Sequence, residues 1–251
     1  MLNSHFYPTV FKRKSFHVFL GCGSETISAE ELRGVEAAYA AAERLYPEIR
    51  TALRIVPASE KVLKRDAEVC VLLYSEKKPN YLLNAGYLGE QLDLYMQEHN
   101  LACVWYGLGK PDLDTYEGLD YVIMFALRKV SDQSKYRKDM FKATRKPLED
   151  IWTGDTLGVA EIARFAPSAC NSQPWRVTQN NGEITVFRHK KPGKIGLLTP
   201  KAAFYFNRID MGIFLCFLEI CMAEKGLAAE RALFPDEEDA EQVKVAEYRL
   251  Q

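Results

Sequence analysis

The stretch ARFAPSACNSQPWR, residues 163–176, decides how the rest of this chain is interpreted. Pro167 disfavours helical backbone in the residue before it, so a helix that reaches Phe165 is expected to end there. Between Pro167 and Pro174 lie four polar side chains that a polar, planar ligand could contact, namely Ser168, Asn171, Ser172 and Gln173. The same residues also suit an ordinary helix-to-strand connector with local Asx and Ser turns.

The order A-P-S-A-x-N-x-Q-P-W, from Ala166 to Trp175, closely resembles the flavin-binding loop of the nitroreductase family of FMN-dependent oxidoreductases. That family carries a second element near the N-terminus, typically Arg-Arg-Ser-x-Arg, whose charges hold the flavin phosphate. Residues 13–17, Arg-Lys-Ser-Phe-His, resemble this element. They depart from it at the last position, where His17 replaces an arginine.

Composition narrows the class of protein. With 251 residues, of which 47% are hydrophobic and 27% charged, the chain can bury a substantial core as one large domain or two small ones. A net charge of -1 with dispersed basic residues predicts no nucleic-acid partner. Six cysteines without a C-x-x-C pair, and no apolar signal segment, favour a reduced, cytoplasmic protein. No apolar run is long enough to cross a bilayer, so no membrane partner is expected.

Apolar periodicity predicts both helices and strands along the chain, and the family resemblance implies that they form an α+β fold. Ser28 and Glu31 form a capping box at the start of a helix whose apolar spacing continues to Leu45. Asn180-Asn181-Gly182 is typical of a hairpin turn. Further helices are expected to begin near residues 80, 147 and 206, and strands are expected at residues 69–74, 101–106, 121–127, 176–179 and 184–187.

One long helical segment occurs twice. Residues 86–102 match residues 212–228 at a constant offset of 126 positions, with Gly86 aligned to Gly212. The repeat predicts two related halves, residues 1–145 and 146–251, packed around a pseudo-twofold axis. Chance similarity between two amphipathic helices is the alternative. Gly86 and Gly89 lie on one helix face, which suits either plain helix packing or the close approach of a backbone or ring.

The resemblance implies a nitroreductase-like fold of two related halves, each with a central sheet flanked by helices, packed as a pseudo-dimer in one chain. Family members are usually homodimers, so this chain is expected to be a monomer or a weak homo-oligomer. FMN is the implied cofactor. Hydride would pass from NAD(P)H through the flavin to a nitroaromatic, a quinone or a similar small aromatic acceptor. Two alternatives remain, a flavin-binding sensor or carrier with little turnover and a cofactor-free interaction module.

The resemblance also implies which residues contact FMN. The phosphate would meet the basic element and a second basic stretch within residues 131–145, which otherwise reads as a solvated linker. Gly107 and Leu108 would bring backbone N–H groups toward the ring. The full set of candidate cofactor-binding residues is Arg13, Lys14, Ser15, His17, Gly107, Leu108, Lys142, Arg145, Pro167, Ser168, Ala169, Asn171 and Gln173.

No catalytic side chain and no metal ligand are expected, because the flavin carries the chemistry and no paired Cys/His spacing is present. Cys170 lies beside polar groups, but no histidine is placed by sequence to activate it as a nucleophile. Replacing Arg13 or Ser168 by alanine is expected to weaken FMN retention without unfolding the chain.

Overall fold

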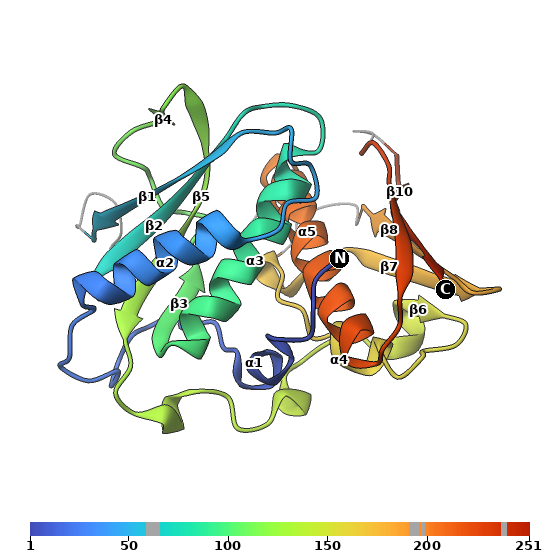
Figure 1. The fold of residues 1–251 in the computed structure, drawn as a ribbon, viewed down its shortest axis with the longest axis horizontal. Helices are drawn as coiled ribbons and strands as arrows, with labels where there is room; N and C mark the ends of the chain where they lie inside the picture. Colours follow the sequence, from blue (N-terminus) through green and yellow to red (C-terminus); the bar gives the residue numbers. More distant parts are fainter. Residues whose placement is uncertain (59–65, 191–195, 197–198, 237–239) are drawn as a thin grey trace. The chain divides into compact units, whose positions relative to one another are not determined.

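The computed structural model describes residues 1–58, 66–190, 196, 199–236 and 240–251 (Figure 1). The chain forms two compact units. The N-terminal unit contains Pro8–Tyr81 and Leu88–Met140, and the C-terminal unit contains Met1–Tyr7, Leu82–Tyr87 and Phe141–Gln251. A short part of one helix and the first seven residues therefore belong with the second half of the sequence.

The N-terminal unit is built on an antiparallel sheet of order β1-β2-β5-β3, with the short β4 paired to β5. Its helices precede and interrupt the strands. In chain order its elements are α1 (Tyr7–Lys12), α2 (Ala29–Ala41), β1 (Thr51–Pro57), β2 (Val69–Ser75), α3 (Tyr81–Glu98), β3 (Leu101–Trp105), β4 (Thr115–Tyr116), β5 (Leu119–Lys129) and the 3₁₀ turn η1 (Gln133–Lys135).

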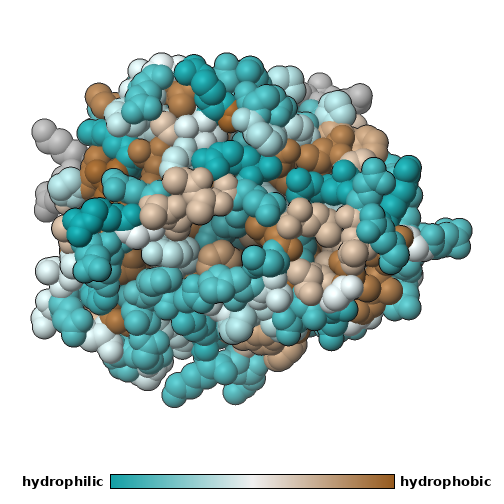
Figure 2. Space-filling model, in the orientation of Figure 1, coloured by the Kyte–Doolittle hydropathy of each residue, from teal (hydrophilic) through white to brown (hydrophobic). Residues whose placement is uncertain are grey.

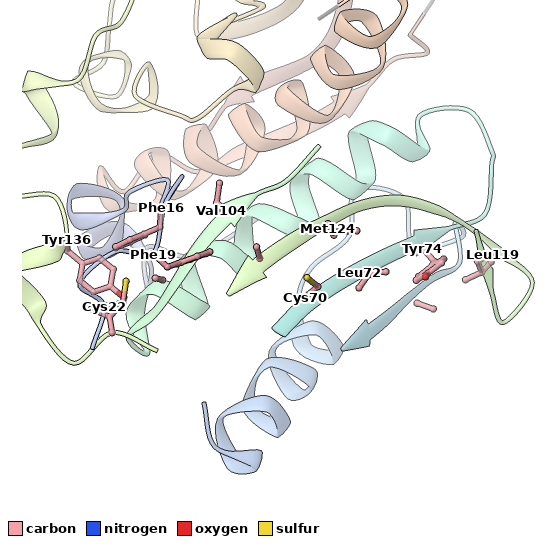
Figure 3. Packing of buried hydrophobic residues seen from close by; sticks show 14 residues of the cluster. Phe16, Phe19, Cys22, Cys70, Leu72, Tyr74, Val104, Leu119, Met124 and Tyr136 are labelled. Carbon is pink, nitrogen blue, oxygen red and sulfur yellow. The ribbon is translucent and has the colours of Figure 1, made fainter. Parts of the chain in front are cut away.

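Both faces of this sheet are covered, as the apolar run at residues 69–74 indicated. Val71 of β2 packs with Val35 of α2 and Leu92 of α3 on one face. Leu72 points to the other face, where Figure 3 shows a second cluster that includes Phe16 and Tyr136. Successive side chains of a strand alternate between faces, so a strand buried on both sides must be continuously apolar.

The C-terminal unit is built on a second sheet, of order β6-β7-β8-β10-β9. All of its pairs are antiparallel except β6–β7. Its elements are η2 (Met140–Lys142), η3 (Leu148–Asp150), β6 (Trp152–Thr153), α4 (Ala160–Ala163), η4 (Ala169–Asn171), β7 (Trp175–Asn180), β8 (Glu183–His189), α5 (Pro200–Glu224), β9 (Ala229–Leu233) and β10 (Gln242–Leu250).

The two sheets share one topology. In the N-terminal unit the chain order β1, β2, α3, β3, β5 gives the sheet order β1-β2-β5-β3. In the C-terminal unit the chain order β7, β8, α5, β9, β10 gives β7-β8-β10-β9. Each half thus places two strands, a long helix and two more strands in the same antiparallel arrangement.

The repeated glycines pack against helix backbone. A Cβ atom on Gly86 would overlap the carbonyl oxygen of Ile209, and a Cβ atom on Gly212 would overlap the carbonyl oxygen of Leu83. Leu83 and Ile209 are themselves 126 positions apart, which is the offset of the sequence repeat. The contact is therefore reciprocal, and the small residues allow the two backbones to touch. Gly89 instead faces the ring of Trp105.

Several expected boundaries are confirmed and others are corrected. The capping box of Ser28 and Glu31 is present, but α2 ends at Ala41 and leaves Leu45 outside. α5 begins at Pro200 rather than near residue 206, because Thr199 caps it and proline suits its first turn. After Pro147 the chain forms only the 3₁₀ turn η3, since β6 follows and pairs with β7.

The hairpin turn is as expected, with positive φ at Asn181 (49°) and Gly182 (77°). Within the described ranges, no helix combines the length and the apolar character that a membrane span requires. On the face drawn in Figure 2, hydrophilic residues predominate and apolar ones are scattered among them.

Replacing Gly86 or Gly212 by alanine should destabilise the protein, although alanine is the better helix former. Each added methyl group meets a backbone carbonyl that cannot rotate away, so each variant should lose about 1–3 kcal/mol of unfolding free energy. The measurement is urea unfolding followed by circular dichroism.

The double variant distinguishes a reciprocal contact from two independent ones. Once one methyl group has forced the helices apart, the second should cost less, so the double loss should be smaller than the sum of the single losses. Strict additivity would contradict the reciprocal contact.

Candidate functional site

The loop between Pro167 and Pro174 is held in an unusual backbone conformation. Cys170, Asn171 and Gln173 have φ values of 49°, 54° and 47°, which lie in the left-handed region. Residues other than glycine pay about 1–3 kcal/mol each for such a conformation, with asparagine at the low end. A short segment with three such residues keeps its shape only if its surroundings fix it.

The basic segment before η3 supplies part of that fixation. Nη1 of Arg145 donates to Oδ1 of Asn171 at 3.1 Å, and Nη2 donates to the carbonyl of Phe165 at 2.9 Å. Nζ of Lys146 donates to the carbonyls of Ser172 and Gln173 at 2.8 and 3.0 Å. Arg145 was expected among the cofactor-binding residues. Lys146 was not, because no spacing rule singles it out.

The loop also closes on itself. Oγ of Ser168 accepts the backbone N–H of Gln173 at 3.0 Å, and the carboxamide of Gln173 donates to the carbonyl and to Oδ1 of Asn171, both at 3.2 Å. Nδ2 of Asn171 donates to the carbonyl of Thr144 at 3.1 Å. Gln173 is buried, and its side chain holds the loop together rather than facing solvent.

Asp210, a buried acid on α5, contacts the loop through its carboxyl group. The backbone N–H of Ala169 donates to Asp210 at 2.9 Å. Asp210 is not among the candidate residues expected from the sequence. The signal that could have identified it is its place three residues after Asn207 on a helix otherwise apolar on that side, since a buried acid needs polar partners.

Trp175 anchors the end of the loop. Its side chain is fully buried and stacks on Phe214 of α5, with 4.8 Å between the ring centroids and 12° between the ring planes. Pro167 is also buried, whereas Ser168 and Ala169 are half-buried and Cys170 and Asn171 are exposed. The loop is therefore fixed at both ends and presents its middle to solvent.

Arg145 and Lys142 are the basic candidate residues of this unit. The acceptors of Arg145 named above are neutral oxygen atoms, which solvate a guanidinium without cancelling its charge. Lys142 is exposed in the same segment. The C-terminal unit thus brings Arg145, Asn171 and Gln173 into direct contact, with Ser168 bonded to the same loop.

The basic element near the N-terminus has a different environment. Nε and Nη2 of Arg13 donate to Oδ2 of Asp93 at 2.9 and 2.5 Å, and Nε lies 3.3 Å from Oε1 of Glu90. Arg13 is only 3% exposed. Burial lowers its pKa, but the charges of Asp93 and Glu90 raise it by more, so the net shift is upward. Arg13 is therefore neutralised inside the N-terminal unit.

Glu90 is a second buried acid in this cluster. Its carboxylate is fully buried and forms no hydrogen bond among the described residues, and burial raises its pKa well above the ordinary range. Asp93 is the better satisfied acid, since Trp105 and Gln97 also donate to it, at 3.0 and 2.5 Å. Arg13 and Asp93 form the shorter ion pair, at 2.5 Å, and Oε1 of Glu90 lies 3.3 Å from Arg13.

The other N-terminal candidates lie around this pair. Nη1 of Arg13 donates to Oγ of Ser15 at 3.3 Å, and Ser15 forms a bridge with Cys103 of β3. Nζ of Lys14 donates to the carbonyl of Lys135 at 3.0 Å. His17 is exposed. In the loop after β3, Leu108 is 71% exposed and follows Gly107.

A sequence profile of the family described as "putative TM nitroreductase" matches residues 5–222. The chain belongs to this family. Among solved structures, a putative nitroreductase from Thermotoga maritima MSB8 is similar to it at 15% identity, with a TM-score of 0.64 over 99% of this chain and 94% of that one. This likeness shows that the chain has a nitroreductase-like fold.

Two further structures match over a smaller share of this family member. A nitroreductase family protein from Clostridium difficile 630 is 19% identical, with a TM-score of 0.46 over 60% of this chain and 96% of that one. A putative nitroreductase in complex with FMN, from Desulfovibrio desulfuricans, is 16% identical, with a TM-score of 0.44 over 60% and 95%. No curated protein matches the chain.

The buried ion pair changes the expected result of the Arg13→Ala substitution. Removing the guanidinium leaves Asp93 buried without a counter-charge, which should cost about 3–5 kcal/mol of unfolding free energy. Urea unfolding measures this loss. The matched control is Arg33→Ala on the exposed side of α2, which should stay within about 0.5 kcal/mol of the unchanged protein. Equal midpoints for the two variants would contradict the structural role of Arg13.

Proposed function

We propose that this protein is an FMN-dependent oxidoreductase whose flavin is held by the loop Pro167–Pro174 and the cations beside it. The observation that carries the proposal is the preformed loop of a nitroreductase family member, in which Arg145 contacts left-handed Asn171 and Lys146 contacts left-handed Gln173. Strained backbone of this kind persists only where its surroundings hold it in place, and it clusters at ligand-binding sites. A rigid loop also binds its ligand without an entropy cost for ordering.

The chemistry of the donor set fits FMN. The phosphate of FMN is an anion, and the side chains of Arg145 and Lys142 are cations of the kind that bind phosphate. Ser168 accepts a bond through its oxygen but keeps its hydroxyl hydrogen for a ligand. Ala169 is half-buried and Asn171 is exposed, so both lie where a ligand could pack on the loop, while Pro167 and Gln173 are buried and shape it.

The bound flavin would supply hydride transfer, and the protein would supply orientation and charge. We infer that NAD(P)H is the donor and that a nitroaromatic, a quinone or a similar small aromatic compound is the acceptor. No side chain of this chain is assigned as an acid or a base. Because all six cysteines are free thiols, we also propose a reducing, cytoplasmic setting.

That the N-terminal element, residues 13–17, binds the flavin phosphate stays a prediction, and we revise which of its residues would do so. Arg13 serves Asp93 in the ion pair, so we assign any contact with the flavin phosphate to Lys14, Ser15 and His17 rather than to the Arg13 guanidinium. Gly107 and Leu108 remain candidates through their backbone N–H groups, since Leu108 is exposed.

We also propose that the chain arose by internal duplication. The shared strand order and the reciprocal glycines support it, and so does a third pair of positions. Trp105 donates to Asp93 in the N-terminal unit, and Arg231 donates to Glu219 in the C-terminal unit at 2.7 Å. Both the donors and the carboxylates are 126 positions apart. Chance similarity of two helices does not account for equivalent contacts to the strands that follow them.

The purified protein should bind FMN and show the absorbance bands of a flavin. Arg145→Ala should weaken FMN binding by about ten-fold or more, because a charge-assisted bond contributes roughly 1.5–3 kcal/mol. Lys142→Ala, which removes an exposed cation, should weaken it less. Fluorescence titration of the apoprotein with FMN measures both effects.

Lys225→Ala is the matched control for these charge changes, since it removes an exposed lysine at the other end of α5 from the loop. Its FMN affinity should equal that of the unchanged protein. A protein that takes up no FMN at all would refute the proposed site and favour a cofactor-free interaction module.

The FMN-loaded protein should oxidise NADH or NADPH steadily when a nitroaromatic or a quinone is present. Steady-state absorbance of the reduced nicotinamide measures this turnover. The expected result is oxidation that depends on the acceptor and saturates with it. A loaded protein that stays yellow and consumes no reduced nicotinamide would instead be a flavin carrier or sensor.

A further inference from the structure

Asp210 is a fully buried acid at the centre of a short hydrogen-bond chain. It is 2% exposed and lies one helical turn after Asn207 on α5. Ala169 donates its backbone N–H to Oδ1 of Asp210 at 2.9 Å. Oγ of Ser172 lies 3.0 Å from Oδ2 of Asp210 and 3.1 Å from Oδ1 of Asn207. Two loop residues are thus tied to one helix face.

With Oδ1 of Asn207 facing Ser172, counting hydrogens favours one form of Asp210. Ser172 has a single hydroxyl hydrogen, and both of its neighbours, Oδ2 of Asp210 and Oδ1 of Asn207, are acceptors when Asp210 is ionised. One of the two short contacts would then lack a hydrogen. When Asp210 is protonated, its hydroxyl donates to Ser172, and Ser172 donates to Asn207. Every contact in the chain then has its own hydrogen.

The surroundings favour the protonated form as well. Burial raises the pKa of Asp210 to about 8, although the bonds from Ala169 and Ser172 lower it. No charged side chain among the described residues contributes to that shift. Arg145 and Lys146 contact the same loop, but they do so at Asn171 and at the carbonyls of Ser172 and Gln173. The acid is neutralised by a proton rather than by an ion pair.

We propose that Asp210 is the positioning residue of the flavin loop and that it acts in its protonated form, holding Ala169 and Ser172 through a hydrogen-bond chain that ends on Asn207. Its contribution is present at low pH and is lost as the pH rises through the range where the buried acid ionises, because the proton that completes the chain leaves. The link to flavin binding rests on the proposed function, whereas the effect on the loop does not.

Two substitutions separate the protonated acid from an anion. In Asp210→Asn the carboxamide can accept from Ala169 through its oxygen and donate to Ser172 through its nitrogen, so it reproduces the protonated acid at every pH. Asp210→Ala removes both contacts. Glu224→Gln, on the exposed end of α5, is the control for removing a carboxylate from this helix.

Hydrogen exchange of the apoprotein, read by mass spectrometry on peptides that cover residues 166–175, tests the effect on the loop. Asp210→Asn and Glu224→Gln should protect the Ala169 amide as well as the unchanged protein does, and Asp210→Ala should lose that protection. Loss of protection in Asp210→Asn would overturn the proposal, since it would mean that the negative charge holds the loop. Should Asp210→Ala fail to fold, the comparison with Asp210→Asn still decides.

The FMN dissociation constant measured across neutral to alkaline pH provides the second test. In the unchanged protein FMN binding should weaken several-fold as Asp210 ionises, and in Asp210→Asn the profile should be flat over the same range. Matching profiles in the two proteins would overturn the proposal. If the unchanged protein binds no FMN, the proposed function fails, while the exchange experiment still judges the role of Asp210.

Discussion

The carbonyl oxygens of Leu83 and Ile209 occupy the space that side chains at Gly212 and Gly86 would need. This backbone contact is the tightest constraint on the two long helices, because neither carbonyl can move without breaking the helix to which it belongs. It also accounts for the burial of α5. Most of that helix is enclosed from Ile209 to Met222, so each polar residue on it must find partners inside the protein.

The buried acids of the two helices meet this requirement in different ways. Asp93 pairs with Arg13, and Glu219 accepts from Arg231 and from the hydroxyls of Tyr87 and Tyr248 at 2.7, 2.7 and 2.8 Å. Both are structural networks in which each lone pair has a donor. Asp210 has neither an arginine nor a tyrosine and relies on a loop for its partners. Each of the two helices thus has one buried acid that an arginine satisfies, and α5 has in addition Asp210, whose partners named above lie in the loop.

Much of the fold follows from local sequence signals. The capping box at Ser28, the turn at Asn181-Gly182 and the apolar run of β2 each arise from contacts between near neighbours, so they can be predicted without tertiary information. The end of α2 at Ala41 could not be predicted from local signals. The absence of a helix after Pro147 could not be predicted either, because it depends on the pairing of β6 with β7. The predicted start of α5, near residue 206, lay too far along the chain because Thr199 and Pro200 were not recognised as its N-cap and first residue.

Part of the candidate site could also be predicted from the sequence, and part depends on tertiary contacts. The proline-bounded loop and Arg145 were expected from the family resemblance, and the structure brings them together within one unit. The ion pair that occupies Arg13 depends on Asp93, which lies 80 positions away in the sequence. Lys146 and Asp210 were missed because their significance lies in the atoms they contact. No spacing in a single sequence reports such contacts.

The two edge strands of the sheet in the C-terminal unit, β6 and β9, are poorly suited to pairing with a further strand. On one side β6 is only two residues long, and on the other β9 reads Ala-Glu-Arg-Ala-Leu, with the charged Glu230 and Arg231 at its centre. Short or charged edge strands are poor templates for a strand from another molecule. Both edges therefore disfavour the addition of a strand from a second molecule to this sheet.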